Sequence, residues 1–399
     1  MRVRTPRSRG ASRHPRPQAE RRALPVRRGA THGEGMVTEP GSGPATPTLT
    51  ISEPRDIVAA IPYLLGYHPS DMLVVLGLCG SSARARLTFR CDLTDETSRH
   101  VAEMAARIAN TLDAHGCDAA LAVAYGPASR ATPCVDAVRA ELAAIGITLR
   151  EALRVTGDRY WSYLCAAPHC CPPEGMPADP ARSPAAATAV LNGLTTWRDR
   201  DQVRQYIAPV EGADRDRVRR ATMVAERRGE ELLARRAASE RDPFGVAFRT
   251  EGVRVVRETV AAACRGELPE APDETAWLGV LLTCVRVRDE AWARISTGAR
   301  SEAAGSVHVG LWRQVLRNVE PAYVAAPGSL LAVAAWRSGD RALAEAALDE
   351  VDRARPAYSM AQLLRQALRA GLPPQECEPT PEWLERVSPV AGEPDERHP

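Results

Sequence analysis

The chain has 399 residues, of which 44% are hydrophobic and 26% charged, and its formal net charge is +2. This length predicts two domains, or three, with enough apolar residues to form hydrophobic cores. No apolar run approaches the roughly 18 residues that a membrane-spanning helix needs, so we expect no membrane insertion. All 52 Lys and Arg positions are arginine, which excludes mechanisms that need a lysine, such as Schiff-base chemistry or a Gly-Lys-Ser/Thr phosphate loop.

Residues 1–48 form a basic tail whose arginines and prolines are typical of a disordered segment. Within residues 1–35, ten arginines stand against Glu20 and Glu34, and there is no continuous apolar segment of the kind a signal peptide has. Two interpretations stay open: an arm that binds nucleic acid or an anionic membrane, or a gene start placed too early, with Met36 as the alternative start. Without the tail the chain is mildly acidic, so we do not expect its folded part to bind nucleic acid.

The first half of the folded chain alternates between strand and helix patterns. Short apolar runs predict strands, and apolar residues spaced three and four apart predict helices. In chain order we predict a helix over 54–66 interrupted near Pro62, strands over 72–78 and 84–91 joined as a hairpin, a helix over 95–114, a strand over 118–125, a helix over 134–145, and strands over 147–156 and 159–164. This order predicts an α/β domain over residues 49–210, with a mixed sheet and flanking helices.

From about residue 185 onward the pattern is helical, which predicts an all-α domain over residues 211–385 and a disordered tail over 386–399. The predicted helices cover 214–240, 273–295, 307–318, 321–337, 340–353 and 358–370. The first of them carries opposite charges four residues apart, such as Asp216 and Arg220, which favours a solvated helix over a nucleic-acid-binding stripe.

Residues 330–356 resemble a single tetratricopeptide-type helix pair. Small residues such as Ala334 and Ala344 stand at helix contacts, Gly339 lies between the helices, and Pro356 closes the pattern. Such a pair is explained either by ordinary helix packing or by a concave surface for a partner. We therefore expect the helical domain to bind a protein partner of unknown identity.

The densest group of reactive side chains lies in a Cys- and Pro-rich excursion over residues 165–184. Cys165, His169, Cys170 and Cys171 follow a predicted strand within seven residues, and thiols with an imidazole are ligands that zinc prefers. However, two of the cysteines are adjacent and there is no second Cys-x-x-Cys pair. Three interpretations stay open: a zinc site, a redox-active pair of Cys165 and Cys170, or the packing of small side chains.

His68, Arg90, Asp92 and Arg159 are the candidate catalytic residues. His68 lies in a loop directly before a predicted strand, where a general base would be well placed, but the sequence places no nucleophile or carboxylate around it. Arg90 and Asp92 are two apart on a strand and point to the same face. They are candidates for clamping a small anion, or for pairing with Arg159 and Asp158 on a neighbouring strand; an ordinary ion pair is the alternative.

Four stretches of the sequence carry a family resemblance: PYLLGYHPSDMLVVLGL, RYWSYLC followed by CCPPEG, LLTCVRVRDEAWARI, and AAPGSLLAVAAWRSGD. With them, residues 49–375 resemble an actinobacterial family classed as domain of unknown function 4192. The resemblance implies a cytoplasmic protein with this two-part layout, but no activity. It directs attention to Tyr67, Pro69, Arg90, Asp92, Trp161, Cys165, Cys170 and Cys171. Where family members often have Asp-Ser before the apolar strand, this chain has Asp71 and Met72, which argues against a serine nucleophile there.

The sequence lacks the GxGxxG, HExxH and GxSxG motifs of common enzyme classes. This favours a non-enzymatic interaction, regulatory or small-ligand-sensing protein. One alternative is an enzyme of small-molecule or hydrolytic type, with a site between the His68, Arg90 and Asp92 loops and the Cys165–Cys171 excursion. Another is a structural thiolate metal site. The ten cysteines are spread through apolar segments, which favours a reducing, cytoplasmic compartment.

Overall fold

The structure is a computed structural model that describes residues 51, 53–80, 84–179, 183–191, 194–235, 244–298, 302–370 and 372–374. The predicted tails over 1–48 and 386–399, with the alternative start Met36, lie outside the described residues. The described residues divide into two compact units, one within 51–60 and 71–191, the other within 61–70 and 194–374.

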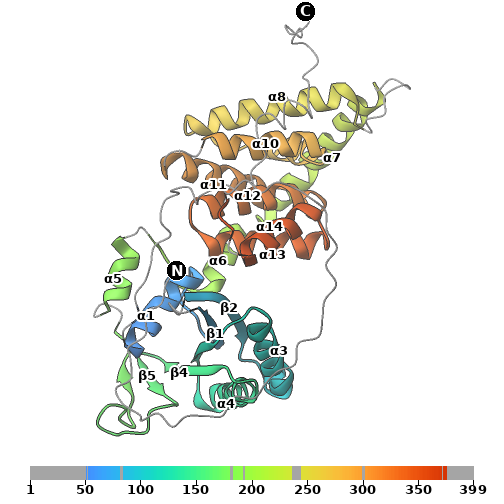
Figure 1. The fold of residues 1–399 in the computed structure, drawn as a ribbon. Coiled ribbons are helices and arrows are strands. Elements are labelled where there is room, and N and C mark those ends of the chain that lie inside the picture. The colour runs from blue at the N-terminus through green and yellow to red at the C-terminus, as the bar shows by residue number, and fades with distance from the viewer. Residues whose placement is uncertain are drawn as a thin grey trace, which may run out of the picture. The chain divides into compact units, whose positions relative to one another are not determined.

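A six-stranded sheet in the order β2-β1-β3-β4-β5-β6 forms the centre of the first unit (Figure 1). Its strands are β1 Met72–Cys79, β2 Arg84–Asp92, β3 Ala119–Tyr125, β4 Thr148–Thr156, β5 Arg159–Ser162 and β6 Met176–Pro177. β3 and β4 pair in parallel, and the other neighbouring strands pair antiparallel. The mixed sheet and the hairpin of β1 and β2 confirm the fold class predicted from the sequence.

The helices up to residue 191 are α1 Pro54–Leu65, α2 Asp95–Arg99, α3 Val101–Ala114, α4 Ala128–Ala144 and α5 Pro184–Leu191, of which α3 and α4 flank the sheet. Buried side chains of α3 and α4, among them Ile108 and Val138, pack with Leu73 and Val75 of β1 in one core. β1 and β3 are buried along their whole length, as strands covered on both faces must be. They therefore form the rigid centre to which the outer strands are attached.

The interruption predicted near Pro62 is wrong, because α1 continues through this residue. A proline inside a helix removes one backbone donor and crowds the preceding turn. Here the proline lies within the last turn of α1, so one hydrogen bond is lost near an end. Its neighbours Ile61 and Leu65 are at most 2% exposed, and we infer that their burial outweighs this cost.

The second unit is helical. Its helices are α6 Arg200–Ile207, α7 Gly212–Ala234, α8 Gly245–Cys264, α9 Pro272–Leu281, α10 Val285–Gly298, α11 Glu302–Arg317, a 3-10 turn Pro321–Tyr323, α12 Ala325–Arg337, α13 Arg341–Ala354 and α14 Ser359–Ala370. Neighbouring helices pack in pairs, α7 with α9, and, as Figure 1 shows, α8 with α10 and α12 with both α11 and α13. α6, which precedes the predicted domain boundary near residue 210, packs on α11 and α13. None of the described helices combines the length and apolar character needed to cross a membrane.

Two sequence predictions for this unit have different outcomes. The pair predicted over 330–356 is confirmed as α12 and α13, and Gly328 lets these helices approach, since an added Cβ would lie 2.5 Å from Val351 Cγ2. The single helix predicted over 273–295 is wrong, because it is broken into α9 and α10. At the break, the carbonyl of Val280 accepts from both the N–H and the hydroxyl of Thr283, at 3.2 and 2.7 Å, which tightens and ends α9.

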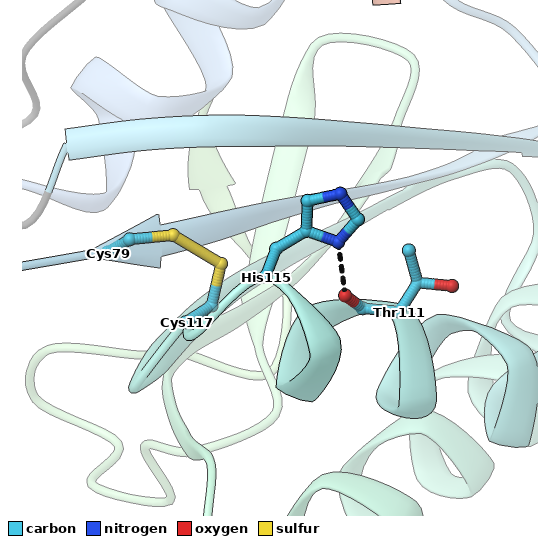
Figure 2. The surroundings of a disulfide bond; sticks show 4 residues. All are labelled: Cys79, Thr111, His115 and Cys117. Carbon is cyan, nitrogen blue, oxygen red and sulfur yellow. Dashed lines mark hydrogen bonds between the residues drawn. A yellow bond between two sulfur atoms is a disulfide. The ribbon is translucent and has the colours of Figure 1, made fainter. Parts of the chain in front are cut away.

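A disulfide joins Cys79, at the end of β1, to Cys117, just before β3 (Figure 2). Both cysteines are buried. In the same region the carbonyl of Thr111 lies 2.8 Å from Nδ1 of His115 at the end of α3. Nothing in the cysteine spacing predicted this pair. The spread of the cysteines favoured a reducing compartment, and this bond was not among the interpretations that it suggested.

Candidate metal centre

The Cys-rich excursion connects two neighbouring strands, β5 and β6. After β5 the chain leaves the sheet and returns as β6, which pairs antiparallel with β5 and places Met176 opposite Tyr160. Both ends of the loop over residues 163–175 are therefore attached to β5. A short loop with fixed ends holds its side chains in a limited set of positions, which a ligand site requires.

Ser162 fixes the start of the loop. Its Oγ accepts the backbone N–H groups of Leu164 and Cys165 at 3.1 and 3.2 Å. The same hydroxyl donates to Oε1 of Glu151 on β4 at 2.8 Å. Burial raises the pKa of Glu151, while its hydrogen bonds from Ser162 and from the Ala152 amide oppose that shift. The backbone at Cys165 is thereby anchored to the body of the sheet.

Arg159 and Trp161 fix the end of the loop. Nη1 of Arg159 donates to the carbonyl of Gly175 at 2.7 Å, and Nε1 of Trp161 donates to the carbonyl of Pro173 at 2.9 Å. The guanidinium of Arg154 lies 3.9 Å from the centre of the Trp161 ring, where a cation–π contact is favourable. Gly175 has a φ of +82°, and a Cβ there would lie 2.5 Å from the Trp161 ring. The loop therefore requires glycine at this position.

Between these anchors the loop brings three sulfur atoms together. The Sγ atoms of Cys165, Cys170 and Cys171 all lie within 4.8 Å of one another. Sγ of Cys170 is 2.9 Å from that of Cys165 and 3.8 Å from that of Cys171. The N–H groups of Cys170 and Cys171 both donate to the carbonyl of Ala167, at 3.1 and 2.8 Å, so a tight turn returns the chain to Cys165. His169, which the sequence analysis included, is exposed and is not part of this group.

Hydrogen bonding within the cluster shifts the pKa values of the three thiols in different directions. The hydrogen bond from Cys170, together with those from the Ala167 region and Cys171, lowers the pKa of Cys165. The same pairing with Cys165 raises the pKa of Cys170, and burial followed by the two neighbouring sulfurs raises that of Cys171. Cys165 is thus the preferred thiolate, with two thiols beside it. A bound cation would take the place of their protons, since thiolates are the form that binds metal.

Arg90 and Asp92 lie far from this cluster. Both lie on β2, where they pair with Val74 and Met72 of β1. β2 is an edge strand, and β1, β3 and β4 separate it from β5. At about 4.8 Å per strand this places them roughly 19 Å from β5. The predicted pairing with Arg159 is therefore wrong, because the β1–β2 hairpin occupies the opposite end of the sheet. An enzyme site that joins Arg90 and Asp92 to the excursion is not supported.

His68 belongs to the second unit. It is exposed, its Nε2 lies 3.3 Å from Oγ1 of Thr196, and its backbone N–H donates to the carbonyl of Trp197 at 3.1 Å. Within the part of the chain that the structure describes, the His68 ring lies beside this hydroxyl and has no carboxylate that orients it. A general base needs both a proton source within reach and a group that holds its tautomer, so the geometry does not assign His68 this role.

The sequence analysis named Arg159 and Trp161 but missed Gly175 and Glu151, which also support the cluster. Gly175 ends a Pro-rich loop, and a glycine in this position could have indicated a tight turn packed against a large side chain. Glu151 carried no signal, because the same strand contains Arg150 and Arg154 and a further charge there looks like ordinary surface alternation.

The protein therefore combines an α/β unit, whose mixed sheet carries a three-thiol loop, with a unit of packed helices that follows it in the chain. The chain belongs to the family described as domain of unknown function (DUF4192), whose model matches residues 54–375. This confirms the family that the motifs indicated. No curated protein and no solved structure matches the chain.

Proposed function

We propose that this protein is a non-enzymatic, metal-binding interaction module, in which Cys165, Cys170 and Cys171 hold one soft cation, zinc in the first place. The observation that carries the proposal is the gathering of three sulfur atoms within 4.8 Å of one another. The centre would link Cys165 to the turn that carries the other two cysteines. Its role would accordingly be structural or regulatory.

The sulfur positions suit a tetrahedral ion. Zn–S bonds of about 2.3 Å at tetrahedral angles place neighbouring sulfurs about 3.8 Å apart. Sγ of Cys170 and Sγ of Cys171 are 3.8 Å apart, which is the distance required. Sγ of Cys165 lies 2.9 Å from Sγ of Cys170 and must therefore move away by about 0.9 Å, a shift that side-chain rotation can supply.

The donor set favours soft metals. Thiolate ligands select zinc and copper(I) over magnesium and calcium, which prefer oxygen. Three thiolates leave one tetrahedral position, which water or a donor from outside the cluster would fill. Arg159 and Ser162, which anchor the loop, would act on the metal through the position of the loop, because groups that orient ligands alter affinity without touching the ion.

Titration with cobalt(II) tests this proposal on the full chain, reduced with a non-chelating phosphine. We expect thiolate-to-cobalt charge-transfer absorption that saturates at one ion per chain and is displaced by zinc. Cys165→Ser, Cys170→Ser and Cys171→Ser should each weaken binding by more than about 100-fold, because losing an orienting partner alone costs about 10- to 100-fold. Cys264→Ser is the matched control, since Cys264 is exposed and free on α8. Absorption that is missing, or equal in all variants, would contradict the proposal.

A second candidate function is protein binding through the helical unit. Met223 and Val224 of α7 are 51% and 53% exposed, although α7 also packs on α9. Large apolar side chains that stay in solvent side by side favour a partner surface. In a native pull-down we expect a stoichiometric partner that the double variant Met223→Ser, Val224→Ser loses and that Leu363→Ser on α14 retains. No stoichiometric partner, or equal loss in both, would count against this function.

A further inference from the structure

We propose that the three-thiol loop is a redox switch, in which a hydroperoxide oxidises Cys165 and Cys170 to a disulfide and the metal is released. The release of metal rests on the proposed function, whereas formation of the disulfide does not. Cys171 would remain a thiol and would be the one protein ligand left from the cluster.

The geometry selects Cys165 and Cys170 as the pair. Their sulfurs are 2.9 Å apart, about 0.9 Å more than the roughly 2.05 Å of a disulfide bond. The turn that ends in the hydrogen bond from Cys170 N–H to the Ala167 carbonyl holds them at this separation across five residues. Rotation of the two cysteine side chains is therefore sufficient to bring the sulfurs to bonding distance.

The adjacent cysteines are a poor alternative. Neighbouring Cα atoms across a trans peptide are about 3.8 Å apart, and unstrained disulfides need a separation of at least about 4.4 Å. A bond between Cys170 and Cys171 would therefore distort the backbone that Ala167 holds. Cys171 is left to complete the metal site or to remain free.

Solvent reaches the pair. Cys170 is exposed and Cys165 is half-buried, whereas Cys134 and Cys284 are buried. Thiol oxidation follows exposure, so the loop is open to a small oxidant while these two core thiols are protected. Cys264 is exposed as well but belongs to the other unit, which makes it the control for oxidation of a thiol outside the cluster.

The chemistry balances with a hydroperoxide as the oxidant. The sulfur of one cysteine attacks a peroxide oxygen and the O–O bond breaks, which leaves a sulfenic acid; the leaving alkoxide or hydroxide takes the thiol proton in the metal-free loop, and a proton from water in the metal-loaded loop, where the sulfurs are thiolates without protons. The second sulfur then attacks the sulfenic sulfur, the S–S bond forms, and the hydroxyl leaves as water with the second proton. Two electrons pass from the sulfurs to the peroxide, and a dithiol reverses the step by exchange.

Oxidation and metal binding are mutually exclusive in this scheme. Thiolates bind metal, and the sulfurs of a disulfide are no longer thiolates. Closing the Cys165–Cys170 bond removes two of the three ligands at once. We expect the zinc affinity of the oxidised loop to fall by more than about 100-fold, since far smaller changes around a metal site cost about 10- to 100-fold.

The test treats the full, zinc-loaded chain with one equivalent of hydrogen peroxide. Zinc release is followed with a chelating dye, free thiols are alkylated, and the tryptic peptide from Tyr160 to Arg182 is sequenced by tandem mass spectrometry. We expect a loss of two hydrogens between Cys165 and Cys170, an alkylated Cys171, zinc release in step with the disulfide, and reversal of both by dithiothreitol. Cys171→Ser should keep the disulfide, Cys170→Ser should abolish it, and Cys264→Ser should behave as the unaltered chain.

The outcomes separate the switch from the proposed function. If no zinc binds at the start but the Cys165–Cys170 disulfide forms, the metal proposal fails and the redox pair stands. If zinc binds but peroxide joins other cysteines, or none, the switch is overturned and the metal centre stands.

Discussion

The indole Nε1 of Trp197 donates to both carboxylate oxygens of Asp340, at 2.9 and 3.2 Å. The same carboxylate accepts the N–H of Leu343 at 2.9 Å and so caps the start of α13. Trp197 also donates its backbone N–H to the carbonyl of Gly66 at 2.8 Å and forms a bridge with Tyr67. Two motifs that indicate the family, one containing Gly66 and Tyr67 and the other ending at Asp340, therefore meet in the second unit.

Replacing Asp340 should destabilise the helical unit. Asp340→Ala removes a helix cap, which costs about 1 kcal/mol, and leaves the Trp197 indole without its acceptor, which costs about 1–2 kcal/mol more. Asp340→Asn keeps one acceptor oxygen and should cost less. Urea unfolding followed by circular dichroism measures both changes. A loss below about 0.5 kcal/mol for Asp340→Ala would show that this contact does not stabilise the unit.

The stability of the helical unit should fall in mild acid because of His308. This residue is 2% exposed, and burial, with the charge of Arg337, lowers its pKa from 6.5 to about 4. The contribution is fully present above pH 6.5. Between pH 6.5 and about 4 the unfolded chain binds a proton that the folded chain does not, which removes up to about 3 kcal/mol.

The matched variant for this effect is His308→Gln, which cannot titrate. We expect urea unfolding of the unaltered chain to weaken more steeply than that of the variant as the pH is lowered from 7 to 4. Parallel curves for the two proteins would mean that folding does not lower the pKa of His308.

Gly175 should be essential to the thiol loop, and Gly157 should not. Both have positive φ, +82° and +60°, but an added Cβ at Gly157 meets nothing within 4 Å, whereas at Gly175 it meets the Trp161 ring. Gly157→Ala should cost about 1 kcal/mol from backbone strain alone. Gly175→Ala should cost more and should also lower cobalt affinity at least about 10-fold, through displacement of the loop. Equal cobalt affinity in the two variants would refute the role given to Gly175.

The disulfide between Cys79 and Cys117 should stabilise the sheet. It closes a loop of 38 residues, and the chain-entropy model gives about 3–4 kcal/mol for a loop of this length. The double variant Cys79→Ser, Cys117→Ser should lose about this much in urea unfolding. Thiol labelling of the unfolded, unreduced chain, followed by peptide mapping, should leave Cys79 and Cys117 unlabelled. Labelling of these two cysteines would contradict the pairing.

Local patterns were enough to predict most of the fold. The apolar runs of β1 and β3 and the helical spacing of α3 are strong signals, because each is buried along a whole strand or face. The sequence did not reveal the strand order, since pairing across the sheet depends on contacts between distant segments. That is why Arg90 and Arg159 were placed on neighbouring strands when the sheet separates them.

The candidate site was predicted only in part, because sequence patterns reveal contacts between residues that are close in the chain but not contacts between distant segments. Cys165, Cys170 and Cys171 lie close in sequence, so a single turn is sufficient to bring them together and the motif could be recognised. His169 lies among them, yet closeness in sequence does not decide which side chains share a face of a turn. The Cys79–Cys117 pair joins segments from two different elements, and no local pattern marks it.

The central claim, that the loop binds metal, is tested most directly by the zinc content of the chain. The full chain would be purified without chelator under reducing conditions, and its zinc measured by inductively coupled plasma mass spectrometry beside Cys170→Ser and Cys264→Ser. We predict about one zinc per chain, absent from Cys170→Ser and retained by Cys264→Ser, since zinc held by thiolates binds tightly at neutral pH. A chain without zinc that also fails to take it up, or one whose zinc survives Cys170→Ser, would contradict the account.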